Sequence, residues 1–355
     1  MTLNARATNL LLAAGTISLA LVACEVGLRL MDGVPLTSFV NLRARNAPPG
    51  AMQAVKTMVD YDPVLSWTVR PHIALGRFNT VDFGIRRSSA GQSGPRTGAV
   101  LVVGGSVTLG GGDLTDEQPW PAVLERIAGQ PVDNAAVPGF GIDQAVLRAE
   151  ALIPILRPRT LLVSISAYSI QWTGRSTSWG VPKPFFTIED GMLRAHNNPV
   201  PRWQPGPVGP VKNMLGHLHL VDRIMTAIDP DGWLAYGSSS RGAGAPVAVS
   251  CLLLARLKAE LDQIGAHAVL VPEPMRSELG STGGPASEVM QVVACGERLG
   301  YRVVPSGAAV AGDYQADPQR TAAYFRDGGT HYTESGSRRL AEIVAAALPA
   351  GPGRE

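Results

Sequence analysis

The sequence predicts an α/β fold in which helices cover both faces of one five-stranded parallel sheet. Two observations predict it: short runs rich in Val, Leu and Ile recur along residues 99–348, and stretches of helical length separate them. Strands that alternate with helices form parallel sheets, because each crossover helix packs back onto the sheet. Right-handed crossovers place the carboxyl ends of the strands at one edge. Residues that follow different strands are therefore expected to lie close together.

Each predicted strand is a short apolar run. The first, at 100–103, reads Val-Leu-Val-Val, which is too short and too β-branched for a helix. Further strands are expected at 132–135, 161–166, 268–271 and 301–304. Helices are expected at 118–128, 143–156, 247–264 and 286–299, and Thr333 is a suitable N-cap for a last helix that runs through Leu340 to Leu348.

The α/β domain is expected to have neighbours on both sides in the chain. Residues 1–31 predict a signal or membrane anchor, and residues 32–98, rich in Pro, Gly and Arg, predict a lead-in that packs beside the core. The domain itself, 99–348, is interrupted by an insertion at about 170–245. The tail 349–355 is expected to be disordered.

The lead-in and the insertion carry local signals of their own. Residues 61–63 and 78–84 predict short strands or turns, and residues 185–192 predict a hairpin with Asp190-Gly191 in its turn. The insertion also holds four of the six tryptophans, which form either the core of an irregular segment or a platform for sugar rings or acyl chains. They are Trp172, Trp179, Trp203 and Trp233.

The N-terminal segment is apolar and short. Arg6 precedes the run Leu10 to Ala23, whose length is nearer to that of a signal-peptide core than to that of a membrane span. The sequence 21–24, Leu-Val-Ala-Cys, resembles a bacterial lipobox, which would make Cys24 a lipidated N-terminus. Alternatively the helix continues as an uncleaved anchor with Arg29 snorkelling. Both interpretations predict a domain tethered to the bacterial cell envelope that faces the periplasm or the exterior.

Composition excludes some partners. Charged residues make up 17% of the chain and the net charge is +2 without long basic runs, so no nucleic-acid surface is expected. The cysteines match no zinc or CxxC spacing, and neither a metal nor a diffusible cofactor is expected. Cys251 and Cys295 lie in apolar helical contexts and are expected to be buried thiols rather than a disulfide.

A candidate nucleophile follows the first predicted strand. Gly104 and Gly105 allow a sharp turn that places Ser106 at the carboxyl end of the strand, where α/β folds bind their ligands. A serine hydroxyl needs a base, and the base needs an acceptor that orients it. His331, just before the last helix, is the candidate base. Asp327, four residues earlier, is the candidate acceptor.

These residues stand in three blocks that resemble those of the SGNH/GDSL hydrolase family, in a membrane-anchored bacterial form. The first block is 104–110, Gly-Gly-Ser-Val-Thr-Leu-Gly, with Gly105 in place of the family's Asp. The second block is 134–141, in which Gly139 stands where the family's second block has its glycine. The last block is 327–331, with the helix that follows. The resemblance covers about 95–348. It implies a flavodoxin-like three-layer α/β/α sandwich and an esterase whose oxyanion hole includes the amides of Ser106 and Gly139.

Besides Gly105, two departures from the family pattern matter for the site. In the third block, Tyr168 stands where the family has an Asn that completes the oxyanion hole, and Ser169 stands where an Asp often follows. The Tyr168 hydroxyl is a candidate substitute donor. The family's Asp usually lies three residues before the His, whereas Asp327 lies four before His331. Asp313 and Asp317 are the alternative acceptors.

The resemblance implies a serine esterase or deacylase that acts on a carbohydrate or lipid ester of the envelope. The same acyl-enzyme could instead pass its acyl group to a sugar hydroxyl, as in an O-acyltransferase. A catalytically weakened module that binds a glycan or a partner is the third hypothesis. Nucleotide binding is disfavoured, because residues 105–110 lack the Lys-Ser/Thr ending of a P-loop and no GxGxxG precedes the helix. The expected partners are a small-molecule or glycan ester and, through the N-terminal segment, a membrane.

Overall fold

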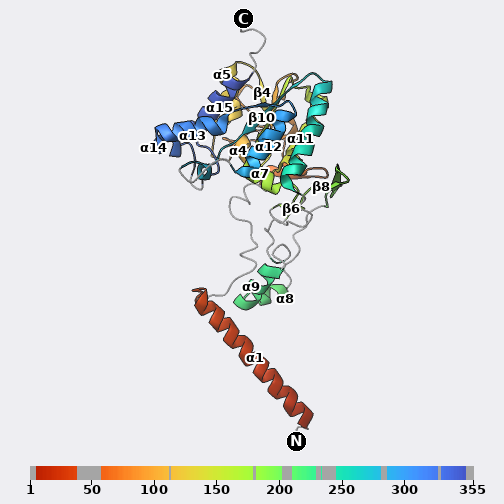
Figure 1. Ribbon diagram of the computed structural model, residues 1–355, viewed down its shortest axis with the longest axis vertical. Helices are drawn as coiled ribbons and strands as arrows, with labels where there is room; N and C mark the ends of the chain where they lie inside the picture. Colours follow the sequence, from red (N-terminus) through yellow and green to blue (C-terminus); the bar gives the residue numbers. More distant parts are fainter. Residues whose placement is uncertain are drawn as a thin grey trace.

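A five-stranded parallel sheet forms the centre of the molecule (Figure 1). The computed structural model describes residues 5–37, 57–111, 113–178, 181–201, 210–228, 233, 245–280, 286–326 and 329–348. The sheet has the order β11-β10-β5-β3-β4. Its strands are β3 (Val100–Val103), β4 (Val132–Asn134), β5 (Thr160–Ile165), β10 (His267–Pro272) and β11 (Arg302–Val303). The predicted fold class is confirmed, and the strand order reverses between β3 and β5, which is where such sheets bind ligands.

Helices cover both faces of this sheet, because alternate residues of each strand point to opposite sides. In β3, Leu101 and Val103 pack on one face and Val100 and Val102 on the other, in two separate hydrophobic clusters. The first cluster includes α6 (Ile142–Leu156), α11 (Pro246–Gln263) and α12 (Ser287–Arg298). The second includes α5 (Trp120–Ala128), α13 (Ser306–Ala316) and α15 (Glu334–Ala347). The result is the three-layer sandwich expected from the sequence.

The predicted elements of the sandwich agree with the observed ones to within two residues at each end. Thr333 caps α15 as expected, since its hydroxyl accepts the Gly336 amide at 3.3 Å. Several short helices were not predicted: α4 (Ser106–Leu109), α7 (Ala167–Trp172), α14 (Pro318–Ala322) and the longer α13. Of these, α7 begins where Ser166 and Ser169 cap its first turn reciprocally, directly after β5.

The lead-in contributes β1 (Val59–Asp62), β2 (Ser66–Val69) and the 3₁₀ turn η1 (Asp82–Gly84). Strands β1 and β2 form an antiparallel hairpin beside the sandwich. Two arginines anchor this segment. Arg86 is fully buried and donates to the carbonyls of Leu109, Gly111 and Leu114, and Arg148 of α6 reaches back to the lead-in at Thr68 Oγ1 (2.9 Å).

The insertion is built from small elements. It contains β6 (Thr177–Ser178), β7 (Val181–Pro182), β8 (Phe185–Glu189), β9 (Met192–His196), α8 (Pro210–Leu215) and α9 (His219–Ile228). The predicted hairpin is β8–β9, and positive φ angles at Asp190 (51°) and Gly191 (76°) form its two-residue turn. Trp233 is buried and donates to Asp222 at 2.9 Å, as a core residue would. Trp179, Trp203 and the tail 349–355 lie outside the described residues.

The expectation of free thiols at Cys251 and Cys295 is wrong. The two residues form a disulfide that joins α11 to α12, with their Cα atoms 5.9 Å apart. The packing of the two helices against each other brings these cysteines together across 44 residues of sequence, and the apolar context of each cysteine gave no sign of that contact.

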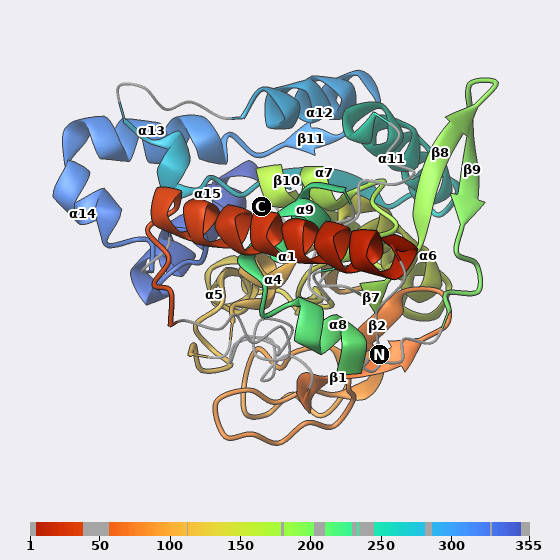
Figure 2. The ribbon, with the colours of Figure 1, turned by 90° about the horizontal axis from the view of Figure 1, so that it is seen from below.

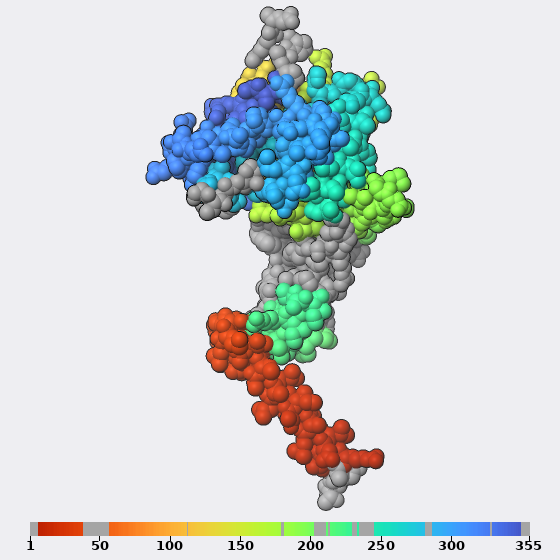
Figure 3. Space-filling view, in the orientation of Figure 1, coloured from red at the N-terminus to blue at the C-terminus, as the bar shows by residue number. Residues whose placement is uncertain are grey.

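Helix α1 (Ala5–Met31) extends away from the sandwich (Figures 1 and 3). Its segment Arg6–Met31 is long and apolar enough to cross a membrane, and its most apolar 18-residue window has a mean hydropathy of 2.0 and is not buried by the rest of the chain. Helix α9 lies against its C-terminal part, as the view from below also shows (Figure 2).

Candidate active site

Ser106 is the first residue of α4 and stands at the carboxyl end of β3. Gly104 must be a glycine, because a Cβ there would lie 1.9 Å from Ser164 Oγ of the neighbouring strand β5. Gly110 ends α4 with φ 96°, and a Cβ would lie 2.4 Å from Pro119. A Cβ at Gly105 would meet only the Phe140 carbonyl, at 3.7 Å. Close packing at Gly104 and Gly110 therefore sets the turn that presents the serine.

The structure brings Ser106 and His331 together across 225 residues of sequence. His331 Nε2 lies 2.9 Å from Ser106 Oγ, a hydrogen-bond distance. The histidine directly precedes Tyr332, which forms an antiparallel β-bridge with Phe325. The Arg326 amide donates to the His331 carbonyl at 2.9 Å. These contacts fix the backbone that carries the imidazole.

The other ring nitrogen of His331 faces a hydroxyl. Thr330 Oγ1 lies 3.1 Å from His331 Nδ1. Asp327, the acceptor expected from the sequence, lies outside the described residues. The two alternative acceptors are wrong, because both are engaged elsewhere: the Asp313 carboxylate accepts two bonds from Arg339, at 2.7 and 2.9 Å, and Asp317 caps α14.

Burial and a nearby cation favour the neutral form of the imidazole. Burial lowers the pKa of His331 below its ordinary value, the positive charge of Arg326 lowers it further, and Asp113 opposes both. The Arg326 side chain is itself held in place, since it bonds to Asp113 Oδ2 at 2.6 Å and to the Tyr332 carbonyl at 3.1 Å. A neutral imidazole is the form that can accept the serine proton.

The three predicted oxyanion-hole residues lie around this serine to different degrees. Ser106 and Tyr168 both line one cavity; Gly139 does not line it, but Phe140 beside it does. The loop that contains Gly139 is tied to the serine turn, because the Val137 amide donates to the Gly104 carbonyl at 3.0 Å. Within the described chain, no hydrogen bond engages the amides of Ser106 and Gly139 or the Tyr168 hydroxyl.

A buried carboxyl group beneath the serine turn was missed by the sequence analysis. Glu273 directly follows β10, and its Oε1 accepts from Thr108 Oγ1 at 2.8 Å and from Trp120 Nε1 at 3.0 Å. Burial raises the pKa of Glu273 to about 7, although these hydrogen bonds and one from Ser164 oppose the shift. A signal was present: an acidic residue at the end of the fourth predicted strand belongs to the same edge of the sheet as Ser106.

The cavity next to Ser106 has a volume of about 280 Å³. Its lining combines hydroxyl groups with aromatic rings, and Tyr168 and Trp172 place their ring centroids 6.1 Å apart. Among the described residues, no three His, Cys, Asp or Glu side chains are placed to bind a metal ion.

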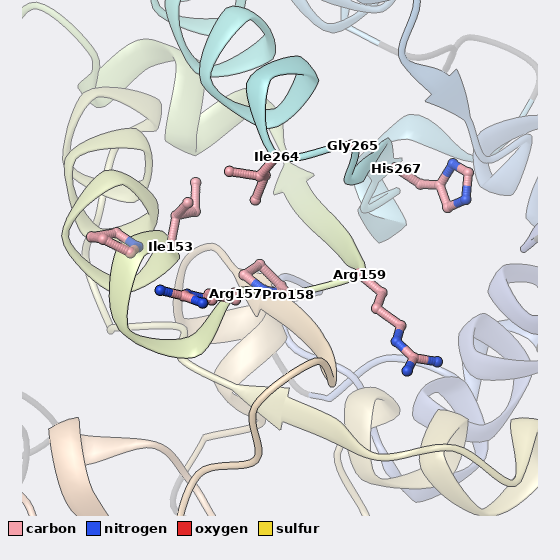
Figure 4. A pocket seen from close by; sticks show the side chains of 8 residues that line it. Ile153, Arg157, Pro158, Arg159, Ile264, Gly265 and His267 are labelled. Carbon is pink, nitrogen blue, oxygen red and sulfur yellow. The ribbon is translucent and has the colours of Figure 1, made fainter.

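A larger cavity, of about 710 Å³, lies at the opposite edge of the sheet (Figure 4). The residues that line it are Ile153, Pro154, Arg157, Pro158, Arg159, Ile264, Gly265 and His267. In Figure 4 the ends of the Arg159 and His267 side chains diverge. None of the predicted site residues lines it.

Comparisons with known proteins give similar structures and no similar sequences. No protein-family model and no curated protein sequence matches this chain. One similar structure is a protein described as lipolytic and of the G-D-S-L family from Desulfitobacterium hafniense, with 11% identity, a TM-score of 0.41, and coverage of 71% of this chain and 100% of that one. Another is an acetyl xylan esterase from Geobacillus stearothermophilus, with 12% identity, a TM-score of 0.40, and coverage of 73% and 99%.

Proposed function

We propose that this protein is a serine esterase of the SGNH/GDSL type, with Ser106 as nucleophile and His331 as general base. One observation carries the proposal: the 2.9 Å contact between Ser106 Oγ and His331 Nε2, at the edge of a cavity where the strand order of a parallel sheet reverses. A nucleophile and a base within hydrogen-bond reach are the requirement for activating a hydroxyl.

The geometry supports a two-step reaction. In the first step His331 Nε2 takes the Ser106 proton as Oγ forms a bond to the ester carbonyl carbon, and the carbonyl oxygen becomes an oxyanion. Collapse of this intermediate breaks the bond to the alcohol oxygen, which receives the proton from His331. In the second step His331 removes a proton from water, whose oxygen bonds to the acyl carbon; the bond to Ser106 Oγ then breaks, Oγ takes the proton back from His331, and the carboxylic acid is released.

We assign three donors to the oxyanion: the amides of Ser106 and Gly139 and the hydroxyl of Tyr168. The support is that these groups are not engaged by the described residues, and that Ser106 and Tyr168 line the same cavity. Donors that are already oriented toward a developing negative charge stabilise it without reorganisation.

Asp327 is the proposed acceptor for the Nδ1–H of His331. A base that accepts a proton at Nε2 must carry one at Nδ1, and a carboxylate there stabilises the imidazolium that forms. The Thr330 hydroxyl, at 3.1 Å, would hold the same tautomer but would add no negative charge.

The proposed substrate is an ester of an envelope carbohydrate or lipid with a short acyl group. A cavity of about 280 Å³ lies at the small end of ligand pockets, which span roughly 300–1,000 Å³, so it favours a short acyl chain. The proposed location is the cell envelope, with α1 as a membrane anchor and the domain outside the cytoplasm. The disulfide between Cys251 and Cys295 supports an oxidising compartment.

A second outcome of the same acyl-enzyme is transfer to a sugar hydroxyl. The Tyr168 and Trp172 rings at the cavity favour it, because paired aromatic rings form a surface on which a sugar ring can stack. An acceptor oligosaccharide added to the reaction would then gain the acyl group, whereas a strict esterase would release all of it as free acid.

The direct test is hydrolysis of p-nitrophenyl acetate by the purified full-length chain in detergent. We expect turnover by the wild type and a loss of about 10⁴- to 10⁶-fold in Ser106→Ala. Ser287→Ala, at an exposed serine of α12, serves as the matched control and should retain full activity. Equal rates for Ser106→Ala and the wild type would eliminate the proposed nucleophile.

A further inference from the structure

The C-terminal part of α1 is joined to the insertion by hydrogen bonds to charged side chains. The Glu25 carboxylate accepts the amides of His219 and Leu220, at 2.8 and 2.7 Å, which are the first two amides of α9. Arg29 bonds to Glu25 at 2.6 Å and donates to the His217 carbonyl at 3.1 Å. A helix of the insertion is therefore capped by a residue of the N-terminal helix.

Asp32, just beyond the end of α1, extends this junction. Its carboxylate lies 2.7 Å from His219 Nε2 and 2.8 Å from Arg223 Nη1. Glu25, Arg29 and Asp32, together with residues 217–223, are called the clasp here. Arg29 is only 4% exposed, so the clasp buries a charge that is fully paired, which is the condition under which burial of a charge is tolerated.

The helices held by the clasp expose apolar side chains. Over residues 210–228, five large apolar side chains are 44–72% exposed: Val211, Met214, Leu218, Ile224 and Ile228. The polar interactions of α9 are instead directed to the clasp and to Trp233, which donates to Asp222. A short helical pair that is polar toward its own chain and apolar toward the outside is typical of elements that lie at a membrane surface.

We propose that α8 and α9 lie at the boundary between the acyl chains and the headgroups of the bilayer that α1 spans, and form a second lipid contact of this protein. The inference rests on the proposed anchoring role of α1. The run Leu10–Ala23 alone is about 21 Å long and too short for a hydrocarbon core of about 30 Å. A span from Leu10 to Met31 is about 33 Å long, and the clasp makes it feasible by pairing Glu25 and Arg29 where α1 leaves the hydrocarbon.

The clasp also sets the depth of the insertion helices. Since Glu25 bonds to the first amides of α9, the start of this helix lies at the level of Glu25, within the last two turns of α1. Helix α9 packs against α1, so its exposed apolar side chains lie beside a helix whose most apolar part is itself uncovered. Lipid is the partner that fits both surfaces at once. The proposal requires that residues 10–32 remain in the mature chain.

The test is fluorescence quenching in vesicles of phosphatidylcholine and phosphatidylglycerol that contain reconstituted full-length chain. In a Cys24→Ser background, single cysteines replace Leu12, Met214, Ile224 or Met290 and carry an environment-sensitive fluorophore. Leu12 reports on α1, and Met290, an exposed methionine of α12, is the matched control. A quencher is attached near the top of the lipid acyl chains.

We expect fluorescence to fall by about twofold or more at positions 214 and 224, which lie within 5–10 Å of the acyl boundary, and not at 290. If position 12 is quenched but 214 and 224 behave like 290, the second lipid contact is overturned while the anchor stands. If position 12 is not quenched, both are overturned. Ester hydrolysis by the same vesicles reports on the proposed esterase function separately.

A clasp variant gives an independent readout. Glu25→Ala removes the carboxylate that caps α9, and we expect weaker quenching at position 224 with unchanged quenching at position 12. Asp60→Ala is the control and should change neither. Asp60 lies in β1, and its exposed carboxylate pairs with Arg70. Unchanged quenching at 224 in Glu25→Ala would show that the clasp does not position α9.

Discussion

Two turns follow neighbouring strands at the point where the strand order reverses, and they present their functional side chains differently. The Ser106 turn after β3 is fixed from several sides: Arg86 holds the Leu109 carbonyl, Asn134 Nδ2 holds the Thr108 carbonyl at 3.0 Å, and Thr108 Oγ1 donates to Glu273. The turn after β5 is fixed by reciprocal bonds between Ser166 and Ser169, but its Tyr168 side chain is 44% exposed and contacts the ring of Trp172.

The difference separates the parts of the site that require rigid support from those that tolerate change. A nucleophile must be held to within a fraction of an ångström of the position from which its base can take the proton, so buried hydrogen bonds around its turn are needed. An oxyanion donor can be supplied by side chains of different shape, and an exposed position can accept a Tyr where the family pattern that the sequence resembles has an Asn.

The first prediction concerns the acceptor behind His331. Asp327→Asn should lower kcat for an aryl ester by about 10⁴-fold, because the wrong imidazole tautomer is favoured and the imidazolium loses its counter-charge. Thr330→Val is the matched change at the neighbouring contact, and it should cost far less. The reverse ranking in steady-state kinetics would transfer the orienting role to the Thr330 hydroxyl.

The second prediction tests the Tyr168 hydroxyl as an oxyanion donor. Tyr168→Phe removes only a hydroxyl and should lower kcat by about 10²- to 10³-fold, the usual loss for one oxyanion donor. Tyr314→Phe, on α13, controls for the general effect of a Tyr-to-Phe change. A Tyr168→Phe enzyme with wild-type kcat would remove this hydroxyl from the oxyanion hole and leave two amides.

The third prediction tests the support beneath Ser106. The pKa of Glu273 is raised in the folded protein, from about 4.5 to about 7, so its stabilising contribution is complete below pH 4.5 and is lost as pH rises through 7. Wild type should therefore lose about 3 kcal/mol of unfolding free energy between pH 4 and 8 relative to Glu273→Gln. Denaturant unfolding of both chains at the two pH values measures this. The exposed Glu117→Gln should show no such difference, and a pH-independent gap for Glu273→Gln would contradict the buried carboxyl's role.

The smallest expected effect is that of the Arg326 charge on the pKa of His331. Because burial and the Arg326 charge lower the pKa of His331, the acid limb of kcat/KM should have its midpoint below the ordinary histidine value of 6.5. Arg326→Gln should move this midpoint upward, while Arg326→Lys, which keeps the charge, should move it less. Equal midpoints in all three pH profiles would exclude Arg326 as a cause of the shift.

Local patterns predicted the sheet and the pair Ser106 and His331, because apolar runs identify strands and the topology rule brings their carboxyl ends together. Long-range pairings were beyond such patterns. The clasp of Glu25 with His219 and Leu220 joins residues almost 200 positions apart, and the disulfide depends on how α11 and α12 pack. Asp313 showed the same limit: spacing suggested a role beside His331, whereas packing gave its carboxylate to Arg339.

Labelling by a fluorophosphonate tests whether His331 activates Ser106, because this reagent reacts with an activated serine and requires no knowledge of the substrate. We expect one labelled site, Ser106, located by mass spectrometry of the full-length chain, and loss of that label in His331→Ala. Labelling of a different serine, or equal labelling of Ser106 in wild type and His331→Ala, would contradict the claim that His331 activates Ser106.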